Sequence, residues 1–445
     1  MKSLVKYLAI YFSFAAIACA QNGKQVVHPE WSINANIYEV NVRQYTPEGT
    51  FSAFEKHLPE LKKLGVDIIW IMPINPIGKL NRKGTLGSYY AVADYKAVNP
   101  EFGTVNDFKK LVNKTHKLGM KIIIDWVANH TAWDNVWVKD HPDFYTRDSK
   151  GKFVPPVADW EDVIDLNYDN KELRSLMIDA MKYWVKECDI DGFRCDVAAM
   201  IPNDFWNEAV PELKKIKHVF MLAEANENYM HSFFDMTYNW PLKDLMDAIA
   251  KGKKKAVDLY PFFEKEAQEY KRNDYRMNHI TNHDLNSWDG SEYERLGEGV
   301  KAFSVLYYTV PGMPLIYSGQ EIGMKKRLRF FDKDTIDWKQ NSMRDFYTKL
   351  NHLKRKNESL WNGEGGADLK MIKTNNENVF VFTREKKSNK IFVAVNLSKQ
   401  PQQVKLNSEL VNGNYVDLFS KKKINIKSNQ YDFSLNPWEY LLLTK

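Results

Sequence analysis

The amino-acid sequence predicts an α/β protein: a (β/α)8 barrel with a short irregular insertion after the third strand and a C-terminal antiparallel β-sandwich domain. Three observations lead to this prediction. Short apolar runs alternate with amphipathic segments from about residue 37 to residue 323. After the third run, a stretch rich in Pro, Gly, Asp and Trp breaks the alternation. From about residue 363 onward, apolar and polar residues alternate, which is typical of antiparallel strands.

Eight apolar runs are the candidate strands of the barrel. Helical patterns lie between them over residues 51–65, 105–119 and 171–187, and two of these end at Gly65 and Gly119, where a helix C-terminus favours glycine. Strands that alternate with helices pair in parallel, and eight such units favour a closed barrel over an open sheet. The runs are NIYEVNV, VDIIWIMP, MKIIIDWV, DGFRCDV, VFMLAEA, SFFDMTY, MNHITNHD and GMPLIYSG.

The chain is too long for one small core, so we expect a large domain and smaller ones. The barrel is assigned to residues 30–362. An inserted subdomain in the third βα loop is assigned to residues 131–168. The β-sandwich, of about eight strands, is assigned to residues 363–445.

The N-terminus resembles an export signal over residues 1–20, with two lysines, an apolar stretch over residues 7–17 and then small residues. Two cleavage sites remain open. The stretch AIAC would leave Cys19 as a lipidated residue that anchors the protein to a membrane, whereas ACA before Gln21 suits an ordinary signal peptidase. Either way we expect an exported protein: periplasmic, a cell-surface lipoprotein or secreted.

The composition is that of a soluble globular protein, with 44% hydrophobic and 27% charged residues. The formal charge is +6, and no basic-aromatic module suggests a nucleic-acid partner. Outside the signal only Cys188 and Cys195 remain, so we expect buried free thiols and no disulfide framework. The aromatic share of 13% suits stacking on sugar rings, although aromatic-rich cores produce the same share.

Polar residues gather at the ends of the candidate strands. In the fourth strand Arg194 and Asp196 share one face, because side chains in a strand alternate. Helix capping explains one such acid well but not four, and burying several carboxylates together is unfavourable unless their charges are used. The residues at these ends are Tyr90 after the second strand, Asp125, Asn129 and His130 at the third, Arg194 and Asp196 at the fourth, Glu224 at the fifth, and His283 and Asp284 at the seventh.

These positions carry a resemblance to a known family. Four stretches are similar, in the right order and on the expected strands, to the four signature regions of the α-amylase family, glycoside hydrolase family 13. The resemblance runs from about residue 35 to the C-terminus, and DLN, GVDIIWIMP, AVADYKAVNPEFGT and GMPLIYSGQEIG support it. The four stretches are DWVANH (125–130), GFRCDVAAM (192–200), LAEA (222–225) and ITNHD (280–284).

The resemblance implies a retaining glycoside hydrolase that cleaves α-1,4-glucosidic bonds in starch or maltodextrins. Asp196 corresponds to the nucleophile and Glu224 to the acid/base. We expect Arg194 to hold Asp196 ionised and oriented. Apolar neighbours are expected to raise the pKa of Glu224 and keep it protonated. Asp284 corresponds to the third acid, which grips the 2- and 3-hydroxyls of the sugar.

The remaining site residues take their expected roles from the motifs around them. His130 and His283 match histidines that bind sugar hydroxyls, and Tyr90 matches the aromatic platform under the same ring. Asp125 is expected to support the site by hydrogen bonding rather than to react.

The chain departs from the family at Ala199 and Met200, where many members have Lys-His. The contacts to the leaving-group sugar must therefore differ, and so must part of the family's calcium site. Calcium is left open, with four candidate ligands, and no organic cofactor is expected. These ligands are Asn129, Asp159, Asp162 and Asp165.

Alternatives within the family are a transglycosylase, an isomerase or an exo-acting α-glucosidase, which share the catalytic residues. The alternative from another class is a non-catalytic glycan-binding homologue. Such a homologue is expected to have lost an acid, whereas Asp196, Glu224 and Asp284 are all present. The expected partner is an α-glucan oligosaccharide or polysaccharide, and we expect a monomer.

Overall fold

The computed structural model describes residues 26–339 and 343–445. The predicted export signal in residues 1–20, with Cys19, lies outside the described residues. Among the described helices, none has the length and apolar character needed to cross a membrane. Cys188 and Cys195 are both buried free thiols, as the sequence predicted.

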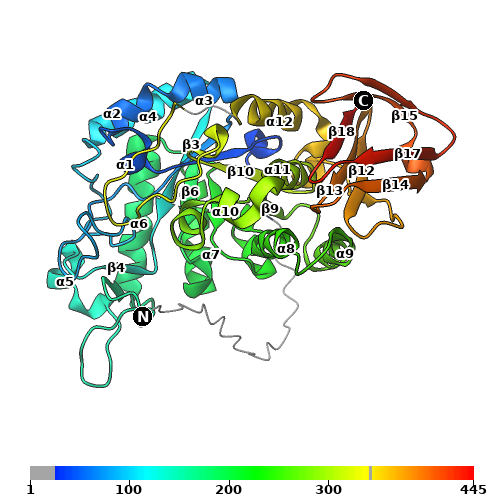
Figure 1. Cartoon of the computed structure of the whole chain (residues 1–445). Coiled ribbons are helices and arrows are strands. Elements are labelled where there is room, and N and C mark those ends of the chain that lie inside the picture. The colour runs from blue at the N-terminus through cyan, green and yellow to red at the C-terminus, as the bar shows by residue number, and fades with distance from the viewer. Residues whose placement is uncertain (1–25, 340–342) are drawn as a thin grey trace, which may run out of the picture.

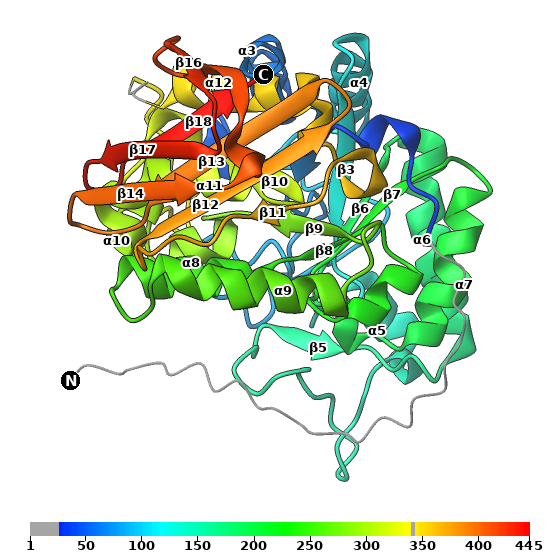
Figure 2. The same cartoon turned by 90° about the vertical axis from the view of Figure 1, so that its right-hand side faces the viewer.

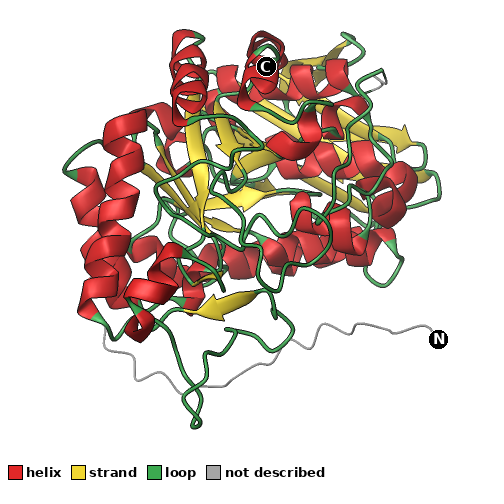
Figure 3. Cartoon of the chain, turned by 90° about the vertical axis from the view of Figure 1, so that its left-hand side faces the viewer, coloured by secondary structure: helices red, strands yellow, loops and turns green. Residues whose placement is uncertain are grey.

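Eight parallel strands close into a barrel in the order β1-β2-β3-β6-β7-β8-β9-β10, which confirms the predicted fold class. Figure 3 shows the yellow strands surrounded by red helices. The seventh barrel strand, β9, ends at Asn278, so the predicted run 277–284 is a strand only at its start and its remainder leads on to Asp284. The strands are β1 Ile37–Val40, β2 Ile68–Ile71, β3 Lys121–Trp126, β6 Gly192–Cys195, β7 Phe220–Ala223, β8 Met236–Tyr238, β9 Tyr275–Asn278 and β10 Met313–Tyr317.

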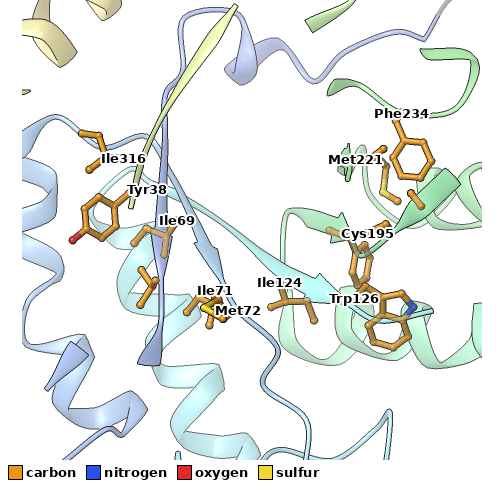
Figure 4. Close-up of a cluster of buried hydrophobic side chains, with 14 of the residues drawn as sticks. Tyr38, Ile69, Ile71, Met72, Ile124, Trp126, Cys195, Met221, Phe234 and Ile316 are labelled. Carbon is orange, nitrogen blue, oxygen red and sulfur yellow. The ribbon is translucent and has the colours of Figure 1, made fainter. Parts of the chain in front are cut away.

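Side chains along each barrel strand alternate between the interior and the surrounding helices. In β2, Ile68 and Trp70 belong to the cluster inside the barrel, whereas Ile69 and Ile71 belong to the core between strands and helices. Figure 4 shows Ile69 and Ile71 in this outer core together with Ile124 of β3 and other outward-facing side chains.

The same alternation places three charged side chains inside the barrel. Glu39, Asp125 and Arg194 lie on the inward face of β1, β3 and β6, and each is fully buried. Phe193 and Cys195, on either side of Arg194, lie in the outer core instead. These charged residues, which looked unsuited to buried strands, therefore point toward the axis of the barrel.

The helices follow the predicted pattern with one break. The expected helix over residues 51–65 is two helices, because Pro59 lies in the first turn of the second, where its missing N–H is tolerated. Gly65 and Gly119 adopt φ of 90° and 68°, as a left-handed helix end requires. The α-helices outside the insertion are α1 Val42–Tyr45, α2 Phe51–Glu55, α3 Leu58–Leu64, α4 Val105–Lys117, α6 Lys171–Cys188, α7 Asn203–Lys214, α8 Trp240–Ala250, α9 Leu259–Glu269, α10 Glu292–Leu296, α11 Val300–Thr309 and α12 Arg344–Lys356.

The insertion after the third barrel strand is more ordered than its composition predicted. Strands β4 (His130–Ala132) and β5 (Val163–Asp165) pair antiparallel, with His130 opposite Asp165. Helix α5 (Val136–Asp140) lies between them in the chain. The insertion protrudes at the lower left of Figure 1 and carries β5 at the bottom of Figure 2.

The C-terminal region is an antiparallel sandwich, as predicted, packed against the barrel at the right of Figure 1. Six strands form one sheet in the order β11-β12-β13-β18-β15-β16, and β14 pairs with β17. Arg384 donates to the carbonyl of Thr309 at the end of α11 (3.1 Å), and Trp438 packs on Phe303 of the same helix. The strands are β11 Lys370–Met371, β12 Val379–Lys386, β13 Asn389–Asn396, β14 Gln402–Asn407, β15 Gly413–Asp417, β16 Lys423–Ile426, β17 Gln430–Leu435 and β18 Tyr440–Thr444.

Candidate active site

The guanidinium of Arg194 joins three carboxyl groups at the carboxyl ends of adjacent barrel strands. Its Nη1 lies 2.8 Å from Asp125 Oδ1 and 2.8 Å from Asp196 Oδ1. Its Nη2 lies 2.9 Å from Glu224 Oε2, an ion pair without hydrogen-bonding geometry. Arg194 is 0% exposed, so these charges interact in a space from which water is largely excluded.

The strand register brings these side chains together. Asp125 in β3 and Arg194 in β6 are direct partners across the sheet. Asp196 and Glu224 are the first residues after β6 and β7, and their backbone N–H groups continue the ladder, Asp196 to the carbonyl of Trp126 and Glu224 to that of Cys195. The structure therefore gathers the acids that the sequence placed at the third, fourth and fifth strand ends.

Three aromatic side chains hold this cluster in place. The Trp70 indole N–H and the Tyr90 hydroxyl both donate to Asp125 Oδ2, at 3.2 and 3.1 Å. The Arg194 Nε donates to the Tyr238 hydroxyl at 3.2 Å, and its guanidinium carbon lies 5.2 Å from the centre of a Trp70 ring. Asp125 therefore has both oxygens engaged by protein groups, which suits the supporting role expected for it.

Val197 adopts a strained backbone next to the acids. Its φ of 37° and ψ of 45° lie in the left-handed region, which a β-branched residue rarely enters. In this conformation its N–H donates to Glu224 Oε2 at 2.8 Å. The left-handed conformation of Val197 points its backbone N–H at the carboxyl group of Glu224. This hydrogen bond fixes the orientation of the Glu224 carboxyl group relative to Asp196.

Burial controls the protonation of the three acids. Desolvation raises the pKa of Asp196 to about 6 and that of Glu224 to about 7, and Arg194 opposes both shifts. The pKa of Asp125 is likewise raised to about 6 by burial. We expected Arg194 to keep Asp196 ionised; its charge does act in that direction, but burial outweighs it. Glu224 remains the more readily protonated member of the pair.

A second cation, His283, lies at the edge of the same cluster. Its Nδ1 lies 2.5 Å from Glu39 Oε1, and its Nε2 lies 3.2 Å from Asp284 Oδ2 and 2.7 Å from the Tyr90 hydroxyl. Burial alone lowers the pKa of His283, but the two carboxylates raise it well above the usual value. Burial likewise acts to raise the pKa of Asp284, but His283 brings it below the usual value. His283 is therefore an imidazolium that keeps Asp284 ionised.

Sequence reasoning missed Glu39, Trp70 and Tyr238. Glu39 is 0% exposed, and its Oε2 has no hydrogen-bond partner among the described residues. The signal was present, because a glutamate in the apolar run NIYEVNV is as unusual as the arginine of the fourth strand. Its partner His283 follows 244 residues later, so nothing local revealed the pair.

Unlike His283, His130 has no carboxylate partner among the residues that the structure describes. It is buried at the start of β4, with Asn129 Nδ2 3.3 Å from its Nδ1 and the ring of Trp160 at 5.4 Å. Burial lowers its pKa to about 3, so its imidazole is neutral. Binding of a sugar hydroxyl by His130 stays a prediction.

The side chains of the candidate calcium ligands do not form a cluster of carboxylates that could surround one ion. Lys83 places its ammonium 3.2 Å from Asp162 Oδ1 and donates to the backbone carbonyl of Asp159 at 2.7 Å. In residues 26–339 and 343–445, no group of three or more His, Cys, Asp or Glu side chains could hold a metal ion. Calcium stays a prediction from the resemblance, and these residues do not fit it.

The place where the sequence departs from the family that it resembles lies at the surface. Ala199 and Met200 form a short 3-10 turn with Ala198 directly after Asp196 and Val197, and Met200 is 46% exposed. The turn after β6 thus presents an apolar side chain to solvent.

Comparison with sequence families matches nearly the whole chain. The family described as "Alpha amylase, catalytic domain" matches residues 22–158 and 149–389, which include the barrel and the insertion. The family described as "Maltogenic Amylase, C-terminal domain" matches residues 369–442, the region of the sandwich.

Individual proteins agree with these matches. Alpha-amylase 3 of Dictyoglomus thermophilum is 27% identical over 454 residues, covering 85% of this chain and 88% of its own. The crystal structure of a noncanonic maltogenic alpha-amylase, AmyB of Thermotoga neapolitana, is 32% identical with a TM-score of 0.85, covering 92% and 98% of the two chains. That of an alpha-amylase from Lactobacillus plantarum is 29% identical with a TM-score of 0.84, covering 93% and 99%.

Replacement of Glu39 tests whether its carboxylate raises the pKa of His283. In Glu39→Gln the imidazolium loses a buried negative neighbour, so the pKa of His283 should fall by about one unit or more. The measurement is an NMR titration of isotope-labelled histidine, with the His283 resonance assigned by its loss in His283→Asn. The matched control is Glu321→Gln, which removes another fully buried glutamate, one that accepts from the Tyr38 hydroxyl on the outer side of β1. An unchanged His283 titration in Glu39→Gln, or an equal shift in both variants, contradicts the assignment.

Chelation tests the calcium prediction. Because Lys83 supplies a positive charge beside Asp162, EDTA should leave the melting temperature unchanged within about 1 °C, whereas removal of a structural ion lowers it. The measurement is a thermal melt with EDTA and then with added CaCl2. A fall of several degrees that CaCl2 reverses would show that calcium binds.

Proposed function

This chain belongs to the α-amylase family of glycoside hydrolases, and we propose that it cleaves α-1,4-glucosidic bonds in starch- or maltodextrin-type α-glucans with retention of configuration. One observation carries the proposal: Asp196 and Glu224 contact the same guanidinium, at 2.8 and 2.9 Å. Retaining enzymes hold their two carboxyl groups about 5–5.5 Å apart, closer than the separation that leaves room for water in inverting enzymes. Two acids that share Arg194 suit the closer arrangement.

The first step needs one acid protonated and the other ionised. Because the pKa of Glu224 lies above that of Asp196, the proton of the pair resides on Glu224. In the proposed step, Glu224 protonates the glycosidic oxygen as Asp196 attacks the anomeric carbon. The bond to the leaving sugar breaks, and a glycosyl ester forms on Asp196.

The second step reverses these roles. Glu224, now a carboxylate, takes a proton from a water molecule, and the water oxygen attacks the anomeric carbon of the ester. The ester bond breaks, Asp196 leaves as a carboxylate, and Glu224 regains its proton. Two inversions at the same carbon return the α configuration.

The surrounding charges favour the transition state. Both steps pass through a species with positive charge at the anomeric carbon. In the proposed site, Asp284 remains ionised beside His283, where it can accept hydrogen bonds from sugar hydroxyls. Tyr90 stacks on His283 with ring centres 5.5 Å apart and supplies an aromatic face next to the reaction centre. Carboxyl groups outnumber cations in this cluster, so its electrostatic potential suits a developing cation.

We further propose that the protein is exported and acts outside the cytoplasm. The support is the signal-like pattern of residues 1–20, with Cys19 as the residue that lipidation would modify. Because starch-type polymers are extracellular nutrients for a cell that cannot import them whole, an exported location suits the proposed substrate.

Substitution of the two acids tests the mechanism. Asp196→Asn should lower the release of reducing sugar from maltoheptaose at least about a thousandfold, because no nucleophile remains. Glu224→Gln should fail equally on maltoheptaose but still react with α-maltosyl fluoride, whose leaving group needs no proton. Asp169→Asn, at an exposed aspartate before α6, is the matched control and should retain activity. NMR of the first products should show the α anomer; a β anomer would refute retention.

The pH profile of kcat/KM tests the protonation states. Activity should rise as pH increases through about 6, because Asp196 must lose its proton, and fall through about 7, because Glu224 must keep its proton. The optimum therefore lies between these values, and the two limbs belong to the coupled pair. In Glu224→Gln, the fall of kcat/KM at alkaline pH should be absent when α-maltosyl fluoride is the substrate, because no Glu224 proton remains to be lost. A profile that is flat from pH 5 to 8 would contradict these assignments.

A further inference from the structure

We propose that Arg276 is a positioning residue for the acid/base Glu224, and that it acts through Asn226 in the loop that follows Glu224. The inference rests on the proposed function, since it concerns the delivery of a proton from Glu224 to the leaving group. Arg276 contacts the loop, β8 and the end of α9, so its effect on Glu224 passes through the backbone of the loop.

The loop after Glu224 lacks the helix that usually follows a barrel strand. In a (β/α)8 barrel each strand is followed by an α-helix that packs on the outside of the sheet. Residues 224–235, all of which the structure describes, connect β7 to β8 through the short 3-10 helix η4 (Asn228–Ser232) and contain no α-helix. Side chains from other elements must therefore hold this loop in place.

Arg276 supplies the central contacts to the loop. In β9, Tyr275 and Met277 belong to the cluster inside the barrel, so Arg276 between them faces outward. Arg276 is 5% exposed, and its Nη2 donates to Asn226 Oδ1 at 2.6 Å while its Nη1 donates to the Asn226 carbonyl at 3.3 Å. Its Nη1 also donates to the Thr237 hydroxyl of β8. One guanidinium thus joins both oxygens of Asn226 to the neighbouring strand.

The end of α9 holds the same loop. The hydroxyl of Tyr270, the residue after α9, donates to the Asn226 carbonyl, and the guanidinium carbon of Arg276 lies 3.9 Å from the centre of the Tyr270 ring. Asn228 Nδ2 donates to the Glu269 carbonyl at 3.1 Å. Contacts from β8, β9 and α9 therefore converge on a segment that begins two residues after Glu224.

An ion pair with Glu266 explains the orientation of Arg276 less well than the loop does. Arg276 Nη2 lies 3.4 Å from Glu266 Oε1, which is farther than from Asn226 Oδ1. Glu266 also has a second partner, since Asn239 Nδ2 donates to its Oε2 at 3.2 Å. Because the guanidinium is planar and rigid, its shortest contacts set its direction, and these belong to the loop and to β8. Glu266 therefore balances the charge of Arg276, whereas Asn226 receives its hydrogen bonds.

The backbone connects the position of this loop to the carboxyl group of Glu224. The Glu224 N–H donates to the Cys195 carbonyl at 2.9 Å. The Tyr238 N–H donates to the Ala225 carbonyl at the same distance, so the sheet holds the chain as far as Ala225. Asn226 is the next residue, where hydrogen bonds from side chains replace those of the sheet. Proton transfer requires Glu224 within hydrogen-bond distance of the glycosidic oxygen, and a displacement of about 1 Å can slow a reaction about a hundredfold.

The experiment compares two aryl α-maltosides of similar size whose leaving groups differ in their need for a proton. p-Nitrophenolate leaves readily as an anion, whereas p-methoxyphenolate needs the proton of Glu224. Arg276→Lys keeps the charge but loses the planar fork that reaches both oxygens of Asn226, and Asn226→Ala removes the side-chain acceptor. Each variant should lower kcat/KM about tenfold or more for the p-methoxyphenyl substrate and about threefold or less for the p-nitrophenyl substrate.

A double-mutant cycle tests whether the two residues act as one unit. The double variant Arg276→Lys/Asn226→Ala should show the same ratio of the two kcat/KM values as either single variant, since the same contact is lost only once. Arg384→Lys is the matched control. Arg384 is also buried, at 1% exposed, but it donates to the carbonyls of Ala367 and Thr309 beside the sandwich, so its replacement should not alter the ratio.

The outcomes separate this inference from the proposed function. An unchanged ratio in Asn226→Ala, or an equal change in Arg384→Lys, overturns the positioning role while leaving the hydrolysis intact. Effects of the two single variants that multiply in the double variant also overturn it, because the residues would then act independently. If Arg276→Lys does not fold, Asn226→Ala decides alone, since it changes a half-buried loop residue. A wild type inactive on both aryl maltosides and on maltoheptaose refutes the proposed function itself.

Discussion

The active site depends on one buried cation. Arg194 has no contact with solvent, and such a charge is tolerated only when opposite charges surround it. Asp125, Asp196 and Glu224 supply them. Asp196 directly follows β6, which carries Arg194, whereas Asp125 and Glu224 come from β3 and from the end of β7, the two strands that flank β6 in the barrel, so the pairing of these strands brings the charges together. Without the guanidinium, three carboxyl groups would repel one another in a space too dry to screen them.

The same burial separates the protonation states that hydrolysis requires. Desolvation alone raises the pKa of every acid in the cluster, and their partners then make them differ. Glu224 meets the guanidinium only through Nη2 and without hydrogen-bonding geometry, which leaves it readily protonated. Asp284 contacts an imidazolium that Glu39 holds in its charged form, and so it stays ionised. The contacts with the two buried cations, Arg194 and His283, therefore leave Glu224 readily protonated and keep Asp284 ionised.

The sequence predicted those parts of the structure that local pattern determines. Alternation within a strand placed Arg194 and Asp196 on the inward face, and apolar runs located all eight barrel strands. Contacts between distant segments carried no local signal: the Glu39–His283 pair and the contact between the tilted rings of Trp288 and Phe330 join residues from different βα units. The balance between burial and charge at Asp196 also required the structure, because neighbours in sequence do not reveal desolvation.

The division between strands and loops explains why the chemistry and the choice of substrate can vary separately. The strand ends hold the acids in a fixed, buried register, so changes there affect every substrate. The loop after β9 presents Trp288, which is exposed, and the turn after β6 presents Met200 on the surface. Where many members of the family have Lys-His, Ala199 and Met200 provide no charged donor and form an apolar surface shortly after Asp196. Loop side chains such as these can change without moving Arg194 and its three carboxyl groups.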